Sequence, residues 1–248
     1  MELVRGQDLY EVLKTIGLLS TEDSQFYTAT IVLILEYLAE KGVVCRDIKP
    51  ENFMVDRQGY LKLINLPAAK KVDKDHQGSL KKTYTIIGTP HYMAPDIVVG
   101  KGYNNMADLW SLGVCLYEFL CGSLPFGDTS EGAYEIYEAI MQNELTFPPF
   151  LHDKKAKKLI EQLLSHNPLQ RHGGSFEALK KHSWFDNFPW KALTDRNKDA
   201  LNPPVLPAGR HIYSDSKQIR LSELVGELEK NMPGVPLEDK WKGFDSVL

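Results

Sequence analysis

The stretch Arg46-Asp47-Ile48-Lys49-Pro50-Glu51-Asn52 carries the strongest signal in this chain. It places a carboxylate at Asp47, an ammonium group two residues later at Lys49 and a carboxamide five residues later at Asn52. These groups suit phosphoryl transfer, in which the Asp orients or deprotonates a hydroxyl, the Lys neutralises the phosphoryl group and the Asn carbonyl binds a metal ion. On its own, the same string would also fit an ordinary polar loop.

The residues on either side of this stretch predict short strands. Val43-Val44 precedes it, and residues 53–55 and 60–64 follow it, joined by the polar turn Asp56-Arg57-Gln58-Gly59. We therefore expect residues 45–52 to form a loop between strands, where polar side chains can project into a cleft.

Most of the remaining chain predicts helices. Ser20 is a good N-cap, and apolar residues then recur at helical spacing until Lys41-Gly42 ends the run. Residues 106–121 are apolar around most of the circumference, as expected of a helix buried at the centre of a domain. Shorter amphipathic helices are expected over 131–143, 153–165 and 175–182. After Trp190 the pattern dissolves, and an extended tail is expected.

The composition is that of an ordinary globular protein of 248 residues, with 43% hydrophobic residues and a formal net charge of −4. The mild acidity argues against nucleic-acid binding, which usually needs a basic excess on one face. The longest apolar stretch is too short to cross a bilayer, so no membrane partner is expected. Three cysteines exclude a disulfide framework and fit a reducing, cytoplasmic compartment.

Further motifs follow the opening stretch in a fixed order. They are Gly88-Thr89-Pro90, Met93-Ala94-Pro95-Asp96, Asp108-Leu109-Trp110-Ser111-Leu112-Gly113, Leu124-Pro125-Phe126 and Asn167-Pro168-Leu169-Gln170-Arg171. From about Met1 to Phe185, this order and spacing closely resembles the C-terminal lobe of eukaryotic protein kinases. The resemblance implies a mainly α fold, with a few short β-strands around the catalytic loop.

Within that superfamily the chain resembles the AGC group, and there the cGMP-dependent protein kinases. The residues that carry this likeness are 83–90, 116–119, 121–122 and 182–185. The tail, with Phe188, Trp190, Pro203 and Pro204, resembles the AGC C-terminal extension in part. The expected organisation is therefore a kinase C-lobe over 1–185 and an AGC-like extension over 186–248.

The resemblance implies roles for single residues. Asp47 resembles the catalytic base, Lys49 the phosphate-contacting lysine and Asn52 a magnesium ligand, while Thr89 resembles the residue that hydrogen-bonds the catalytic Asp and Lys. ATP with Mg²⁺ is the implied cofactor. Met1 to Val4 match the hinge that meets adenine, Asp8 the acidic residue near the ribose and Met54 the apolar floor beneath the base. The residues assigned to nucleotide binding are Glu2, Val4, Asp8, Glu51 and Met54.

Other implied roles concern the substrate, regulation and scaffold. Asp8, Glu51 and Glu118 together would favour a basic peptide or protein substrate through charge complementarity. Thr85 matches the activation-loop phosphosite, with Arg46 and Lys70 as its basic clamp. Asp108 is expected to brace the catalytic loop, and Asp96 with Arg171 to form a buried ion pair in which Asp, replacing the usual Glu, shortens the reach by one methylene.

Two departures from the family pattern guide the functional hypothesis. The metal-binding Asp-Phe-Gly is replaced by Asn65-Leu66-Pro67, which keeps a carbonyl oxygen for the metal but loses its negative charge. Pro67 cannot copy Gly, because its φ is fixed and it lacks an N–H. No glycine-rich phosphate loop, no strand lysine for the α- and β-phosphates and no glutamate partner of that lysine precedes Met1. An N-terminal lobe is therefore expected to be absent, and the cleft face, with Leu66 and Met54, to be exposed.

Three hypotheses remain open. The first is a pseudokinase-like regulatory or docking module, inactive alone, whose exposed cleft face binds a kinase N-lobe or a regulatory protein. The second is part of an active ATP-dependent serine/threonine kinase whose N-lobe lies outside this sequence. The third is a truncated product with no activity of its own.

Overall fold

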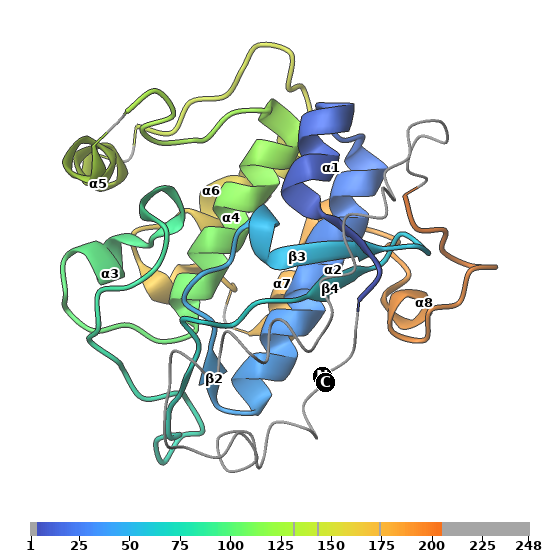
Figure 1. Ribbon diagram of the computed structural model, residues 1–248. Helices are drawn as coiled ribbons and strands as arrows, with labels where there is room; N and C mark the ends of the chain where they lie inside the picture. Colours follow the sequence, from blue (N-terminus) through green and yellow to red (C-terminus); the bar gives the residue numbers. More distant parts are fainter. Residues whose placement is uncertain (1–3, 131, 143, 174, 205–248) are drawn as a thin grey trace, which may run out of the picture.

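The computed structural model describes residues 4–130, 132–142, 144–173 and 175–204 (Figure 1). Its helices are α1 (Leu9–Ile16), α2 (Thr21–Glu40), α3 (Pro95–Val98), α4 (Met106–Cys121), α5 (Ala133–Gln142), α6 (Lys154–Leu163), α7 (Phe176–Lys180) and α8 (Trp190–Thr194). Short 3₁₀ turns are η1 (Pro50–Asn52), η2 (Pro90–Tyr92), η3 (Pro168–Gln170) and η4 (Ser183–Phe185). None of the helices within these ranges is long and apolar enough to span a membrane.

Helix α4 forms the centre of the core. Figure 1 shows it in the middle of the molecule, and α2 and α6 pack against it. Every residue of α4 except Glu118 is buried, as the apolar circumference of 106–121 predicted. At Gly113 a Cβ would lie 2.8 Å from the Cβ of Leu163, so α6 approaches α4 at a distance that no larger residue permits.

The strands form two small antiparallel sheets. One sheet has the order β1 (Gly6–Asp8), β3 (Phe53–Asp56), β4 (Leu61–Leu63), and the other pairs β2 (Val43–Val44) with β5 (Lys70–Lys71). The predicted strands over 43–44, 53–55 and 60–64 are thus present, and the carboxylate of Asp56 accepts from the N–H groups of Gln58 and Tyr60 in the predicted turn. Residues 45–52 form the expected connection between β2 and β3.

The ends of the helices follow local capping chemistry. The Ser20 hydroxyl accepts from the N–H of Asp23, 3.0 Å away, which confirms the predicted start of α2. The helices expected over 153–165 and 175–182 are α6 and α7, each somewhat shorter than predicted. Helix α1 was not predicted, because a single residue, Asp8, ends β1 and also caps α1 by accepting from the N–H of Glu11.

The expectation of an extended tail after Trp190 was wrong for its first part. Residues 190–194 form α8, and Trp190 lies against Phe185, with ring centroids 4.9 Å apart. Farther on, the guanidinium of Arg196 lies over the Tyr60 ring, and Pro203 lies so close to Gly59 that a Cβ there would be 2.7 Å from the Pro203 Cβ. The chain from Trp190 to residue 204 therefore packs against the preceding part of the molecule. Residues 205–248, the rest of the expected extension, lie outside the described ranges.

Candidate active site

A buried carboxylate holds the loop that carries the opening stretch. The two oxygens of Asp108, on α4, accept from the backbone N–H groups of Cys45 at 2.9 Å and Arg46 at 2.7 Å. Arg46 has a left-handed φ of 69°, which few non-glycine residues adopt. Close by, a Cβ on Gly88 would lie 2.7 Å from the Arg46 carbonyl oxygen, so this position requires glycine. Asp108 braces the loop, as predicted.

Four predicted catalytic residues lie together in one hydrogen-bond network. Asp47 Oδ1 accepts from the hydroxyl of Thr89 at 2.8 Å and from its N–H at 3.1 Å. Lys49 Nζ donates to the same hydroxyl at 2.7 Å and lies 3.6 Å from Asp47 Oδ2. Asn52 Nδ2 donates to Asp47 Oδ2 at 3.0 Å and to its carbonyl at 2.7 Å. The network brings base, cation and amide together, and their individual roles stay predictions.

The residues assigned to the nucleotide lie on the neighbouring sheet, apart from Glu2, which falls outside the described ranges. Asp8 and Met54 are paired across β1 and β3. One oxygen of Asp8 caps α1, so part of its hydrogen-bonding capacity is already used. Val4 and Met54 are half-buried, whereas Glu51 is exposed on η1. These positions are compatible with a shared surface, and the assignments stay predictions.

The Asn65-Leu66-Pro67 segment follows β4 directly. The N–H of Ile64 donates to the Asn52 carbonyl at 3.0 Å, which sets the next residue, Asn65, beside the catalytic loop. The N–H of Ala69 donates to the Leu66 carbonyl at 3.1 Å, closing a turn with Pro67 at its second position, where proline is favoured. Leu66 is half-buried against the core rather than fully exposed, whereas Asn65 is exposed.

These residues fit magnesium poorly. Mg²⁺ is usually bound through one or two carboxylates together with phosphate oxygens. Here the two residues predicted to bind the metal, Asn52 and Asn65, supply neutral amides. The carboxylate of Asp47, predicted as the base, already accepts hydrogen bonds from Thr89 and Asn52 and lies near Lys49. Within the described ranges, no three His, Cys, Asp or Glu side chains are arranged to hold a metal ion.

A second group of carboxylates surrounds Glu118 of α4. The Tyr92 hydroxyl donates to Glu118 Oε2 at 2.8 Å. Burial raises the pKa of Glu118 to about 7, the charges of Glu51 and Asp128 act in the same direction, and the Tyr92 hydroxyl opposes them. Glu51 and Glu118 were predicted from the sequence, whereas Tyr92, which directly precedes the Met93-Ala94-Pro95-Asp96 motif, was not.

The raised pKa of Glu118 predicts a pH-dependent stability. The folded protein keeps a proton on Glu118 that the unfolded chain loses near the ordinary glutamate pKa of 4.5. The stabilisation is thus complete below that value and disappears as the pH rises through 7, a loss of roughly 2 kcal/mol for this half-buried group. Urea unfolding across this range should show that Glu118→Gln flattens the decline, whereas Glu135→Gln, on an exposed part of α5, leaves it unchanged. An unchanged slope in Glu118→Gln would contradict the assignment.

The residues expected to clamp Thr85 have other partners. Lys70 Nζ donates to the Thr83 hydroxyl at 3.0 Å, and Arg46 Nε donates to the Ala68 carbonyl. The backbone of Thr85 is held instead by the Tyr103 hydroxyl, which donates to its carbonyl at 2.6 Å, while Thr85 itself is exposed. The structure thus leaves Thr85 accessible, and the clamp remains a prediction.

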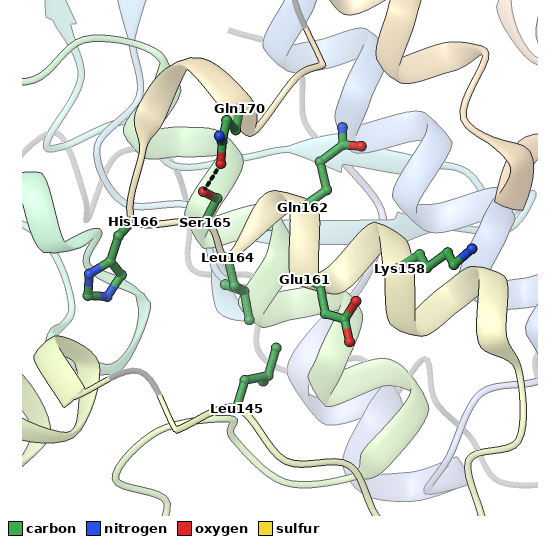
Figure 2. A pocket seen from close by; sticks show the side chains of 8 residues that line it. All are labelled: Leu145, Lys158, Glu161, Gln162, Leu164, Ser165, His166 and Gln170. Carbon is green, nitrogen blue, oxygen red and sulfur yellow. Dashed lines mark hydrogen bonds between the residues drawn. The ribbon is translucent and has the colours of Figure 1, made fainter.

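A pocket of about 530 Å³ lies elsewhere, along α6 and the turn that follows it (Figure 2). Its size is within the range of ligand sites. Several of its polar groups bond to one another or to the backbone, as Ser165 does to Gln170 at 2.9 Å and Gln162 to the Arg171 carbonyl at 3.2 Å. None of the residues predicted for the site lines it, so the candidate active site stays at the catalytic loop.

Comparison with known proteins agrees with this geometry. The family description "Protein kinase domain" matches residues 1–185. The chain belongs to the protein kinase family. It is 43% identical over 244 residues to the cGMP-dependent protein kinase of Eimeria tenella, a match covering 97% of this chain and 23% of the relative. It is 44% identical over 220 residues to that of Toxoplasma gondii, covering 88% and 21%.

A cAMP-dependent relative is more distant. The catalytic subunit PRKX of Mus musculus is 37% identical over 210 residues, covering 84% of this chain and 56% of the relative. This kinase chain is thus related to the cGMP-dependent protein kinases, as its motifs predicted. It spans 23% and 21% of the length of the two cGMP-dependent relatives named above.

Proposed function

We propose that this chain is a serine/threonine protein kinase C-lobe of the cGMP-dependent type that transfers phosphate very weakly or not at all and serves as a pseudokinase-like regulatory or docking module. The observation that carries the proposal is Asn65, a neutral residue where the family's metal-binding Asp is expected. Loss of one unit charge from a metal site at short range weakens the interaction by about 4 kcal/mol at intermediate dielectric.

The surface beside Asn65 supports the docking role. Ile64 is 42% exposed, and Leu66 and Met54 are half-buried, so an apolar face adjoins the catalytic loop. The proposed partner on this face is a kinase N-lobe or a regulatory protein. The three free cysteines are all buried, in keeping with the proposed cytoplasmic location.

An active ATP-dependent kinase is the alternative, and a specific observation favours it. The network of Asp47, Lys49, Asn52 and Thr89 is complete. With an N-lobe supplied from outside these 248 residues, such a loop would act on a basic peptide, because Asp8 and Glu51 offer negative charge to it. Glu118 adds to this charge as the pH rises through about 7, the value to which burial raises its pKa.

Phosphate transfer from ATP to a basic peptide separates the two hypotheses. We expect the chain to show no transfer above that of its Asp47→Asn variant, with Mg²⁺ and with Mn²⁺. Transfer by the native chain that Asp47→Asn abolishes would contradict the pseudokinase-like proposal and support the active kinase. Circular dichroism of both proteins checks that the substitution leaves the fold intact.

A further inference from the structure

The charge of the catalytic loop is compensated within the protein. Asp47 and Lys49 lie 3.6 Å apart and are mostly buried, with side-chain exposures of 14% and 21%. Asp47 also accepts from Asn52 Nδ2, the Thr89 hydroxyl and the Thr89 N–H. A carboxylate with three donors and a cation beside it has little remaining affinity for a metal ion, and it repels an approaching anion weakly.

The neighbouring position adds no negative charge. Asn65 is placed beside the catalytic loop by the hydrogen bond from Ile64 to the Asn52 carbonyl. The turn Leu66–Ala69 that follows is closed by the hydrogen bond from the Ala69 N–H to the Leu66 carbonyl, and Pro67 fixes one backbone φ within it. The hydrogen-bonded network therefore contains one carboxylate, that of Asp47, and it is compensated, while Glu51 lies outside the network and is exposed. An Asp at position 65 would add an uncompensated carboxylate beside this network.

A second carboxylate, such as an Asp at position 65, would make phosphate binding depend on a divalent cation. Two anionic groups facing a phosphate at short range repel it strongly, and a divalent cation between them removes that repulsion. With the Asp47 carboxylate compensated, the repulsion is small before any cation binds. Lys49 Nζ donates to Thr89 and lies 3.6 Å from Asp47, so its ammonium group can be shared between Asp47 and a phosphate and act as a direct counter-charge.

We propose that this loop binds the phosphates of a nucleoside di- or triphosphate without a divalent cation. The inference rests on the proposed function for the identity of the ligand. The poor fit to magnesium, caused by Asn65 and the compensated Asp47, would then have two effects. It would reduce turnover, and it would remove the need for a divalent cation in phosphate binding.

Ligand-detected NMR or calorimetry with ATP tests this on the full 248-residue chain, once with excess Mg²⁺ and once with EDTA. We expect the two dissociation constants to agree within about threefold. Asn65→Asp should bind ATP at least about tenfold more tightly with Mg²⁺ than with EDTA. Asn65→Ala, a neutral matched control, should keep the native behaviour. Lys49→Met should weaken binding in EDTA at least about tenfold, since it removes the proposed counter-charge.

Two outcomes would overturn the inference: ATP binding by the native chain that requires Mg²⁺, or an Asn65→Asp variant that is as independent of cations as the native chain. Absence of ATP binding under every condition would overturn it too, while leaving the docking role intact. Phosphate transfer by the native chain would contradict the proposed function alone, so the two failures are distinguishable.

Discussion

Replacing Arg171 with methionine is expected to lower the free energy of unfolding by about 3–5 kcal/mol, as is typical when one partner of a buried ion pair is lost. The Arg171 side chain is 0% exposed and pairs with Asp96 of α3 at 2.5 Å. It also donates to the carbonyls of Ser165 at 2.9 Å and Met106 at 3.0 Å. The substitution leaves the Asp96 carboxylate buried without its cation and removes donors from two carbonyls.

The ion pair joins α3 to the residue that follows η3, so its loss should destabilise both segments. Asp96 Oδ2 is buried without a hydrogen-bond partner in the described part of the chain, in keeping with the short reach of Asp. Only Oδ1 of this carboxylate therefore holds Arg171. Urea unfolding measures the effect. Arg196→Met is the matched control, because Arg196 pairs with Asp56 at 3.8 Å and is 47% exposed, so a change below about 1 kcal/mol is expected there. Equal effects at both sites would refute the argument.

Asp108→Asn should lower the free energy of unfolding by about 2–3 kcal/mol and loosen the catalytic loop. Burial raises the pKa of Asp108 to about 6, while the N–H groups of Arg46 and Cys45 act against this and favour the charged form. Asparagine has nearly the same volume but only one oxygen, so one of the two N–H groups would face an amide NH₂. Arg46 would then lose support for its left-handed φ of 69°.

Amide hydrogen exchange tests this at the affected residues. The N–H groups of Cys45 and Arg46 should exchange faster in Asp108→Asn than in the native protein. Asp75→Asn is a suitable control, because Asp75 also accepts from two N–H groups, those of Gln77 and Ser79, but lies in an exposed turn where Asn is well tolerated. Unchanged exchange at Cys45 and Arg46 would show that Asp108 is not the brace of the loop.

The regular elements were largely predictable where their signals are local. Ser20 caps α2 and the Asp56 turn joins β3 to β4 because the groups involved are a few residues apart. Two helices were missed. Helix α1 has local signals, since Asp8 caps it, Lys14 lies in its last turn and Gly17 ends it, but it is only eight residues long and follows β1 directly. Helix α8 has five residues and depends on Trp190 packing against Phe185. In α8, tertiary packing of Trp190 stabilises a helix that the local sequence does not predict.

In the candidate site, too, contacts within a short motif were predictable and contacts between distant residues were not. Asp47, Lys49 and Asn52 belong to one short motif, so their proximity follows from the sequence. The partners of the clamp residues did not follow from it, since Lys70 bonds to Thr83 and the Thr85 carbonyl to Tyr103. The electrostatic state of Glu118 also depends on Tyr92, 26 residues away in the sequence.

Local chemistry in the chain accounts for the order of the motifs, the mainly helical fold and the neutral Asn65, because each depends on residue type and near neighbours. The compensation of Asp47 by Thr89 joins residues 42 apart, and the pairing of Asp96 with Arg171 joins residues 75 apart. Burial, charge compensation and pKa depend on which distant groups meet in a low-dielectric interior. Those properties arise when the helices pack around α4, and they set both the stability of the lobe and the cation requirement proposed for its catalytic loop.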